Sequence, residues 1–367
     1  MKELRIKDIC DKGSSNLKQK DVEGKNGLYP VYGASGIISH IDTYHQDSSY
    51  IAIVKDGSGI GRVTFMPAKS SVIGTMQYIL PKEGFNINYI GYCLQSLDLS
   101  KYKQGAAIPH IYFRDYGERI VKVTEDIKEQ QSIVDYLDSA FAKIDAMKAN
   151  AEKSLNEAKA LFQASLKEML EPKEGWEEKT LKDVSVIYGN YGLSVPSTEY
   201  NGVRYLRITD ITEWGDLNDE KVSAKLDEEK EQELLEEGDI LFARTGATVG
   251  KTLMYKKAFG KCLFAGYLIR YRLDKKLLLP KYVFYITHSD NYYKWVLDNQ
   301  KAAAQPNISA KLYNDYIVSY PPLSTQQSIV TTLDSLKSKV DRLQENYDKI
   351  SLECDGLKQA FLRQVFE

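Results

Sequence analysis

The chain has 367 residues, with 49 Lys and Arg against 51 Asp and Glu and a formal net charge of −2. This length fits two or three domains, each large enough to bury a core. No apolar run reaches the length of a signal peptide or a membrane span, so we expect a protein of the reducing cytoplasm. The four cysteines lie far apart without a CxxC pair, and His40 and His45 fall in a loop-like stretch, which argues against a disulfide framework and a metal site.

The first block, residues 1–125, is predicted to be a globular α+β domain. It mixes short strands, tight glycine turns and one or two short helices. The stretch YIAIVKDGSGIGRVTFM, residues 50–66, indicates a strand, a glycine loop and a second strand. The block carries 16 basic and 13 acidic residues.

Residues 126–173 are predicted to form a first long helix, which Pro172 ends. Apolar and small residues recur with alternating steps of four and three, which is typical of a coiled-coil seam. The larger seam residues are Ile133, Leu137, Ile144, Met147 and Leu161.

The second block, residues 174–323, is predicted to be another α+β domain. The stretch VRYLRITDI, residues 203–211, alternates as a strand does, and an acidic run follows at residues 227–239. The stretch GDILFARTGATVGKTLMY, residues 238–255, again indicates two strands around a glycine loop. Residues 240–323 carry 13 basic against 4 acidic residues, a local charge of +9 that favours phosphate contact over a simple solvated face.

A second long helix is predicted over residues 324–367, with Ser324 or Thr325 as its cap. Its seam residues are Leu333, Leu336, Val340, Leu343, Tyr347, Ile350, Leu357 and Phe361. The helix begins with QQSIVTTLDSLKSKVD at Gln326 and repeats QQSIVDYLDSAFAKID at Gln130, a shift of 196 residues. Roughly 18 of 42 aligned positions are identical over the two helices.

The repeat predicts an architecture of two similar domains joined by a pair of long helices. The second block starts where the first helix ends and finishes where the second begins, so we expect the helices to run antiparallel with a pseudo-two-fold axis. The repeat extends beyond the helices, since GAAIPHI at residues 105–111 resembles AAAQPNI at residues 302–308. A chain that repeats one design in this way is expected to have a function that needs two similar targets or partners.

Known catalytic motifs do not fit the sequence. The loop GATVGKT has only three residues between Gly246 and Gly250, whereas a phosphate-binding loop needs four and a following helix. The YPP at Tyr320 lacks the Asn or Asp that precedes it in amino-methyltransferases, and no GxGxxG follows a strand. We therefore expect no catalytic activity in this chain.

The chain resembles the specificity (S) subunit of type I restriction–modification systems. The resemblance rests on YPVYGASGI at residues 29–37, GDILFARTGATVGK at 238–251, the Gln-Pro-Asn-Ile element at 305–308 and the two QQSIV helix starts. Their order and duplication cover essentially the whole chain. One departure is Ile108, which stands where the first domain would be expected to carry Gln before Pro.

The resemblance implies two target-recognition domains joined by antiparallel coiled-coil helices. Each domain would read one half of a bipartite, asymmetric DNA target, and the helices would set the half-site spacing. Methyltransferase (M) subunits would hold S-adenosylmethionine and dock on the helices, and motor-nuclease (R) subunits would join that core. The chain itself would then hold no cofactor.

Loops rich in hydrogen-bond donors next to strands are the expected DNA-contacting positions, because Arg reads guanine and Asn reads adenine, and both also hold phosphate. In the first domain these are Tyr29, Tyr32, Ser35, Lys55, Ser58, Arg62, His110 and Arg114. In the second they are Tyr191, Arg204, Arg207, Arg244, Thr245, Thr248, Lys251, Asn307 and Lys311. The glycines of the two loops have a simpler explanation in turn geometry.

Two other classes of protein remain open from the sequence. A coiled-coil adaptor or scaffold without a DNA target would show the same helices, but the basic region and paired domains disfavour it. An NTP-dependent enzyme would need a phosphate loop of different spacing.

Overall fold

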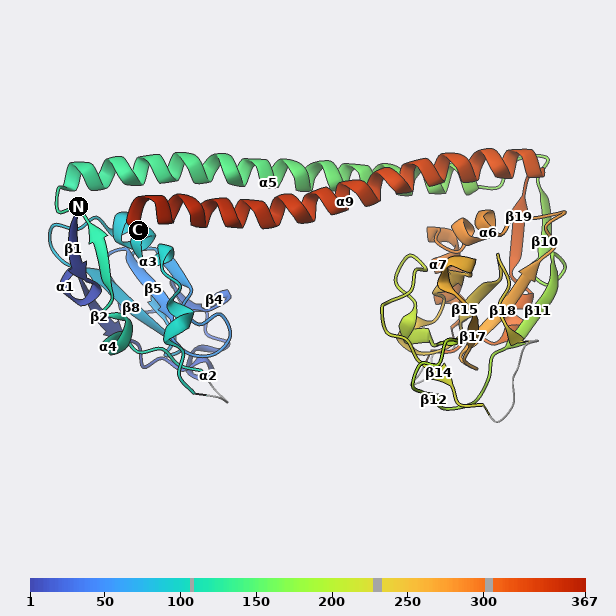
Figure 1. Ribbon diagram of the computed structural model, residues 1–367, viewed down its shortest axis with the longest axis horizontal. Helices are drawn as coiled ribbons and strands as arrows, with labels where there is room; N and C mark the ends of the chain where they lie inside the picture. Colours follow the sequence, from blue (N-terminus) through green and yellow to red (C-terminus); the bar gives the residue numbers. More distant parts are fainter. Residues whose placement is uncertain (106–108, 227–232, 301–305) are drawn as a thin grey trace. The chain divides into compact units, whose positions relative to one another are not determined.

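The structure is a computed structural model that describes residues 1–105, 109–226, 233–300 and 306–367 (Figure 1). It divides into two compact units, the first comprising Met1–Lys153 with Glu345–Glu367 and the second Ser154–Gln344. Each unit contains one α+β domain and a stretch of both long helices, which confirms the predicted fold class.

The domain of the first unit is built on a four-stranded antiparallel sheet of order β2-β8-β5-β6. A second sheet has the order β4-β3-β7, with β3 and β7 parallel, and β1 pairs with β9. The strands are β1 (Lys2–Arg5), β2 (Cys10–Ser14), β3 (Tyr29–Gly33), β4 (Gly36–Ile41), β5 (Tyr50–Val54), β6 (Val63–Met66), β7 (Ser71–Val72), β8 (Met76–Pro81) and β9 (Ile120–Val123). The helices are α1 (Ile6–Ile9), α2 (Gln19–Val22), α3 (Ile87–Ser96), the 3-10 helix η1 (Leu99–Tyr102) and α4 (Phe113–Tyr116).

The domain of the second unit has a four-stranded antiparallel sheet of order β11-β18-β15-β16, a β10-β19 pair, a β12-β14 pair and a parallel β13-β17 pair. Its strands are β10 (Glu177–Thr180), β11 (Ser185–Tyr191), β12 (Ser197–Thr198), β13 (Arg204–Leu206), β14 (Ser223–Ala224), β15 (Ile240–Ala243), β16 (Thr252–Met254), β17 (Cys262–Phe264), β18 (Leu268–Leu273) and β19 (Ile317–Tyr320). Its helices are α6 (Pro280–Ile286), α7 (Asp290–Asn299) and α8 (Ala310–Asn314), with 3-10 turns η2 (Ile208–Asp210), η4 (Gly246–Thr248) and η5 (Lys257–Phe259).

The two domains share one topology. The sheet β2-β8-β5-β6 corresponds strand by strand to β11-β18-β15-β16, the β1-β9 pair to β10-β19, and the parallel β3-β7 pair to β13-β17. Both predicted strand–loop–strand segments are present, as β5-β6 and β15-β16. The sequence repeat is therefore also a repeat of fold.

One predicted strand is shorter than expected. The stretch at residues 203–211 was predicted to be a continuous strand, but only Arg204–Leu206 is a strand, and a 3-10 turn follows at Ile208–Asp210. The carboxylate of Asp210 accepts the backbone N–H of Arg207 at 2.8 Å, so a local side-chain bond replaces the strand ladder at this point.

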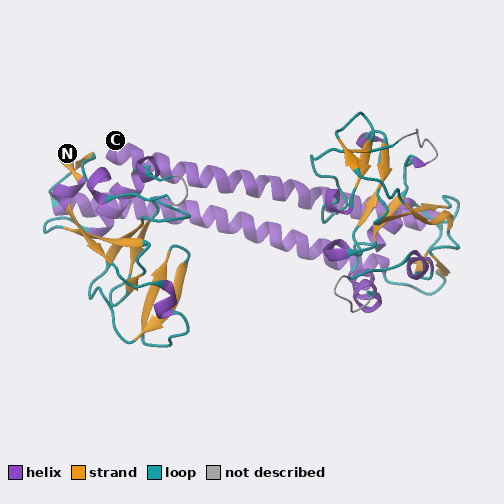
Figure 2. Cartoon of the chain, turned by 90° about the horizontal axis from the view of Figure 1, so that it is seen from below, coloured by secondary structure: helices purple, strands orange, loops and turns teal. Residues whose placement is uncertain are grey.

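The long helices are α5 (Ile127–Leu170) and α9 (Leu323–Phe366), each of 44 residues. In the first unit Lys358 Nζ lies 2.5 Å from Asp145 Oδ1, and Lys148 Nζ lies 3.9 Å from Asp355 Oδ1. Because the partner numbers fall as the others rise, the two helices run antiparallel there, side by side as in Figure 2. In the second unit Lys159 Nζ donates to Gln344 Oε1 at 2.8 Å.

Ten of the thirteen predicted seam residues are buried or partly buried. Leu137, Ile144, Leu333 and Val340 are buried, while Ile133, Leu336, Leu343, Tyr347, Ile350 and Phe361 are partly buried. Met147, Leu161 and Leu357 are exposed at 56%, 59% and 45%, so these three assignments were wrong. Leu155, Phe162 and Leu362 are buried, and each lies one residue after a position of the predicted seam register, namely 154, 161 and 361. An α-helix has 3.6 residues per turn, so a strict seven-residue pattern drifts away from the contact line after a few turns.

The start of α9 also differs from the prediction. Ser324 and Thr325 lie inside the first turn, and the carbonyl of Pro322 accepts the backbone N–H of Gln326 at 3.1 Å. Proline has a fixed φ that suits the beginning of a helix, so the helix starts before the two hydroxyl residues.

A buried glutamine attaches each long helix to its own domain. The amide Nε2 of Gln130 donates to the carbonyls of Gly84 and Thr124, and its Oε1 accepts the backbone N–H of Asn86 at 2.7 Å. Gln326 makes the same three bonds in the second unit, to Leu277, Pro321 and Leu279. The QQSIV motif therefore marks a helix anchor as well as a helix start.

Neither long helix, nor any shorter helix in the described ranges, could cross a membrane. In the same ranges no group of three or more His, Cys, Asp or Glu is placed to hold a metal ion. All four cysteines are buried thiols.

Candidate nucleic-acid interface

In the first domain the glycine loop after β5 pairs with the segment that precedes α4. The backbone N–H of Gly57 donates to the carbonyl of Pro109 at 3.2 Å, and that of Ile111 donates to the carbonyl of Lys55 at 2.9 Å. Between these bonds Asp56 and His110 form an isolated antiparallel bridge. Main-chain hydrogen bonds therefore join the two chain segments, whichever side chains lie between them.

The second domain contains the same arrangement. The backbone N–H of Gly246 donates to the carbonyl of Pro306 at 3.0 Å, and that of Ile308 donates to the carbonyl of Arg244 at 2.9 Å. Thr245 and Asn307 form the bridge. We call this contact the clasp: residues 55–57 with 109–111 in the first domain, and 244–246 with 306–308 in the second.

The side chains on the first clasp form a polar and aromatic cluster. Nδ1 of His110 lies 2.6 Å from Oδ1 of Asp56, and Lys55 Nζ lies 3.6 Å from the other carboxylate oxygen. The ring of His110 stacks on Tyr112 with centroids 6.2 Å apart, and the guanidinium of Arg114 lies 4.7 Å from the centroid of the Tyr112 ring. Lys55, His110 and Arg114, predicted separately from the sequence, are thus brought together.

Of the other predicted residues of the first domain, three lie on or beside the glycine loop and two lie on the second sheet. Ser58 is exposed on the same loop, and Arg62 donates to the carbonyl of Ala34 at 2.9 Å, which places it beside the turn that carries Ser35. Tyr29 and Tyr32 lie on β3, in the other sheet, where Tyr29 packs edge-on against Tyr44 at 4.8 Å and Tyr32 covers an apolar core cluster.

On the second clasp, an arginine lies over an aromatic ring and donates to an amide oxygen. The guanidinium of Arg244 lies 4.9 Å from the centroid of the Tyr191 ring, and its Nε donates to Oδ1 of Asn307 at 3.3 Å. The hydroxyl of Tyr191 in turn accepts the backbone N–H of Ala310 at 3.0 Å. Stacking on a ring fixes the plane of the guanidinium, which suits bidentate recognition.

The glycine loop of the second domain is a short 3-10 turn. Gly246 has φ of +71°, which favours glycine, and the hydroxyl of Thr248 donates to the carbonyl of Thr245 at 3.1 Å. Strand β16 follows rather than a helix, as expected from the spacing of GATVGKT. Lys311 is exposed on α8.

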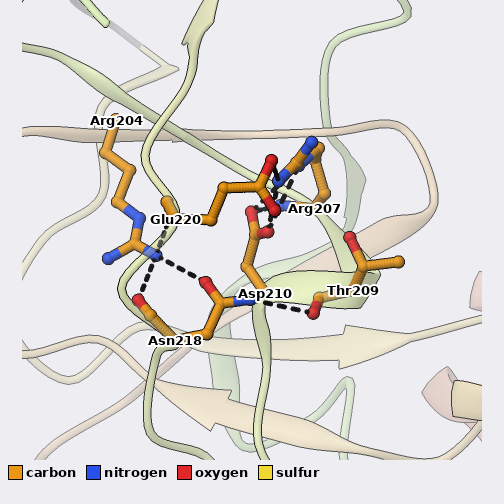
Figure 3. A network of polar contacts seen from close by, with 6 residues as sticks. All are labelled: Arg204, Arg207, Thr209, Asp210, Asn218 and Glu220. Atoms are coloured by element: carbon orange, nitrogen blue, oxygen red, sulfur yellow. Dashed lines mark hydrogen bonds and ion pairs between the residues drawn. The ribbon is translucent and has the colours of Figure 1, made fainter. Parts of the chain in front are cut away.

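Two predicted arginines of the second domain are engaged within the protein (Figure 3). Arg204 is 5% exposed and donates to the carbonyls of Asn218 and Glu220, both at 2.7 Å. The prediction that Arg204 contacts DNA is therefore not supported, because its side chain supports a loop. Arg207 is bonded to the buried carboxylate of Asp210, which raises the pKa of its guanidinium, and lies 3.0 Å from Glu220 Oε1.

A groove of about 640 Å³ lies beside the second clasp. Its walls include Ser194, Arg207, Thr209, Arg244 and Tyr267. Polar donors therefore line one side of the domain next to the stacked arginine.

A protein-family model matches this chain over nearly its whole length and decides its family. The family described as type I restriction modification DNA specificity domain matches residues 1–157 and again residues 173–352. The chain belongs to this family. Two copies of the family domain agree with the two copies of the fold.

Specificity subunits of type I restriction enzymes are among the similar proteins. The chain is 23% identical over 307 residues to the StySPI specificity subunit of Salmonella potsdam, covering 78% of this chain and 66% of that protein. It is 27% identical over 258 residues to the EcoKI specificity subunit of Escherichia coli strain K12, covering 65% of this chain and 55% of that protein. The chain thus spans less than two thirds of the length of these relatives.

Solved structures share the fold. A chain from the structural study of complex assembly and conformational transition of the type I R-M system has a TM-score of 0.75 at 17% identity, covering 99% of this chain and 96% of that one. The HsdS subunit from Thermoanaerobacter tengcongensis has a TM-score of 0.58 at 16% identity, covering 99% of this chain and 95% of that one.

In this family member the basic region of the second domain is not one bare patch. Lys251 pairs with Glu213 at 3.4 Å, Lys256 with Asp216 at 3.4 Å, and Arg272 with Asp239 at 2.7 Å. Acidic residues from elsewhere in the sequence thus offset three of the nine excess positive charges of residues 240–323. Net charge along a segment was a poor guide, because pairing occurs in space.

Sequence reasoning missed two aromatic residues that lie at the clasps. Tyr112 is 43% exposed between His110 and Arg114, and Tyr267 is 61% exposed with its carbonyl accepting the backbone N–H of Arg244 at 3.0 Å. The position of Tyr112 between two predicted basic residues was a usable signal. Tyr267 lies in the turn between β17 and β18, and nothing in the sequence around it indicated a role.

Proposed function

We propose that this chain is the DNA-specificity subunit of a type I restriction–modification complex, in which each domain reads one half of a bipartite, asymmetric target. The clasp is the observation that carries this proposal. The same main-chain geometry presents Lys55, Asp56 and His110 in one domain and Arg244, Thr245 and Asn307 in the other. The two clasps have the same main-chain geometry but present different hydrogen-bonding side chains, which suits two half-sites of different sequence.

The side chains of the second clasp match the chemistry of base edges. Arginine donates two parallel bonds to guanine and asparagine pairs with adenine in the major groove. The stacked guanidinium of Arg244 and the amide of Asn307, which orients it, are the pair from which we expect base recognition. Lys311, exposed on the following helix, suits a phosphate.

The long helices have the second role in this proposal. They set the spacing between the half-sites and bind the methyltransferase subunits, which hold S-adenosylmethionine, and motor-nuclease subunits join that core. Exposed apolar side chains on the helix pair, such as Met147 at 56% and Leu352 at 76%, suit further helices. This chain contributes recognition and no catalysis, and the complex acts on DNA in the cytoplasm.

Mapping of methylated sites tests the proposal. Cells with the methyltransferase subunit should show methylation at a two-part motif only when this chain is present. Replacing Arg244 and Asn307 by Ala should change the bases at one half of the motif and leave the other half unchanged. A motif that is unchanged, or methylation that does not depend on this chain, would contradict the proposal.

The alternative is an adaptor without a DNA target. Duplex binding by the assembled complex should weaken steeply with salt if phosphates are contacted. Equal retention of the complex on duplex and on neutral resin at all salt concentrations would favour the adaptor.

A further inference from the structure

The first unit has an open groove where its domain meets the long helices. The groove measures about 580 Å³, within the range of roughly 300–1,000 Å³ typical of binding pockets. Its aromatic walls come from Phe65, Tyr92 and Phe141. Arg62 lies at its edge, and the helix residues Lys358 and Gln359 line its other side.

The second unit has a region equivalent to this groove, and one Tyr–Asp hydrogen bond that occurs in both units identifies it. The hydroxyl of Tyr92 donates to Asp138 of α5, and the hydroxyl of Tyr285 donates to Asp334 of α9 at 2.5 Å. The two aspartates are equivalent in the helix repeat. By the same repeat Lys337 corresponds to Phe141, Phe162 to Lys358 and Gln163 to Gln359, while Lys251 follows Gly250 as Arg62 follows Gly61.

In the second unit Trp214 occupies that place. Its ring stacks on His288 with centroids 4.9 Å apart and planes 11° apart, meets Phe162 edge-on at 5.4 Å, and lies 5.0 Å below Lys337 Nζ. The neighbouring carboxylate of Glu213 lies 3.4 Å from Lys251 Nζ. An aromatic ring beside a carboxylate therefore fills the second groove.

A tight turn delivers this pair of side chains. Ile211 and Leu217 form a bridge that closes the loop, and Gly215 has φ of +68°. A Cβ on Gly215 would lie 2.7 Å from a ring carbon of Phe284 and 2.7 Å from the carbonyl of Thr252, so only glycine fits at this point. The loop is thus built to bring Trp214 close to the domain.

The first domain has no such loop after its equivalent strand. Strand β3 leads directly through Ala34 and Ser35 into β4, and Arg62 donates to the carbonyl of Ala34 at 2.9 Å. No aromatic side chain stands between Gly33 and Gly36. The first groove keeps its aromatic walls and its basic edge without the internal occupant.

We infer that the first groove receives an aromatic side chain of the methyltransferase subunit, carried next to a carboxylate on a tight turn. The inference rests on the proposed function, because it takes the partner from it. Arg62 would meet the carboxylate as Lys251 meets Glu213, and the rings of Tyr92 and Phe141 would hold the aromatic side chain. Buried aromatic anchors contribute strongly to protein interfaces, which makes one such contact a useful docking point.

The lining favours a protein side chain over nucleic acid. Three aromatic residues form its walls, and the carboxylate of Asp145 also lines the groove, where Lys358 pairs with it at 2.5 Å. A phosphate would find Arg62 together with a neighbouring carboxylate, whereas the edge of an indole or phenol finds apolar contact.

Substitutions at two repeat-equivalent glutamines test the inference. Gln359→Trp fills the open groove from α9, while Gln163→Trp places the same side chain at the equivalent exposed position of α5, where Trp214 already fills the groove. Assembly of the full chain with its methyltransferase subunit is measured by calorimetry. We expect Gln359→Trp to weaken assembly by at least about tenfold and Gln163→Trp to change it by less than about twofold.

A photo-reactive phenylalanine at each position gives a second readout that does not depend on loss of binding. We expect position 359 to crosslink to an aromatic residue next to a carboxylate in the methyltransferase subunit, and position 163 to give no crosslink. Equal assembly of both Trp variants, or no crosslink from position 359, would overturn the inference. Weakened DNA binding with intact methyltransferase assembly would assign the groove to nucleic acid and equally overturn it. Failure of the unsubstituted chain to assemble would instead contradict the proposed function itself.

Discussion

The backbone N–H of Leu279 donates to Oε1 of Gln326 at 2.9 Å, and this bond joins the second domain to the first turn of α9. Gln326 is fully buried, and its Nε2 donates to two further carbonyls. Gln326→Ala would leave three main-chain groups without this partner, one of them in a buried bond and two in partly buried bonds. We expect a loss of stability of about 1–3 kcal/mol, since each unsatisfied buried group carries a desolvation cost.

Hydrogen exchange at the amide of Leu279 measures this effect locally. The neighbouring Gln327 is exposed, so Gln327→Ala is the matched control and should leave exchange unchanged. Equal protection of Leu279 in both variants would show that the glutamine does not anchor the helix.

The observed seam can be separated from the heptad pattern by two substitutions on α5. Ile144 is 5% exposed and Met147 is 56% exposed, although both belong to the predicted seam. Ile144→Asp should destabilise the first unit by about 3–5 kcal/mol, because it buries an unpaired charge. Met147→Asp should have little effect. Thermal unfolding followed by circular dichroism checks both, and equal losses would contradict the observed register.

Arg244 should set one base of the target, if the proposed function holds. Arg244→Ala is expected to lose about 1–3 kcal/mol of discrimination at a single position of one half-site. Lys311→Ala, at an exposed position, should weaken binding to all sequences alike. Selection from randomised duplexes by the assembled complex distinguishes the two patterns. A uniform loss for both variants would place Arg244 on the phosphate backbone.

His288 should make the second unit less stable in mild acid. Burial holds the pKa of this imidazole below its ordinary value of 6.5, with Lys337 acting in the same direction. The unfolded chain therefore binds a proton more readily than the folded chain, and stability falls as the pH drops through 6.5 toward the lower folded pKa. Gln95 stands three residues after Tyr92 in the first unit, as His288 stands three residues after Tyr285. His288→Gln, which places the same residue type in the second unit, should flatten this dependence. Melting temperatures between pH 8 and pH 5 measure it, and an unchanged slope would refute the assignment.

Lengthening both helices tests whether they set the spacing. One heptad inserted after Ser154 and after Ile350, which are repeat-equivalent, adds about 10 Å to each helix, or roughly three base pairs. We expect unchanged half-site bases with a longer spacer in the methylated motif. Three base pairs also rotate one half-site by about a third of a turn, so weaker binding is expected too. Changed bases with an unchanged spacer would contradict the spacing role.

The sequence was sufficient for the features that repeat. The two QQSIV segments, the paired glycine loops and the two long helices followed from self-similarity, and Pro172 indicated where the first helix ends; both strand pairs are present. The seam was less predictable, because Leu161 and Phe162 are both apolar and only the accumulated helical twist decides which of them faces the partner helix.

The site was predictable only in part, for a reason of topology. Lys55 and His110 were each recognisable as donors, but nothing local in the sequence brings residues 55–57 to residues 109–111. Arg204 shows the opposite case. It resembles a surface arginine in sequence, yet the fold turns it toward the carbonyls of Asn218 and Glu220.

In the clasp, main-chain bonds hold the two segments together, while the side chains between them would face a binding partner. Its bonds run from Gly57 to Pro109 and from Gly246 to Pro306 through main-chain atoms, so the intervening side chains do not form them. Replacing His110 or Asn307 removes a side-chain bond, to Asp56 or to Arg244, but leaves the main-chain bonds of the clasp in place. Under the proposed function, a lineage carrying this fold could change its DNA target at single bases while the scaffold stays the same.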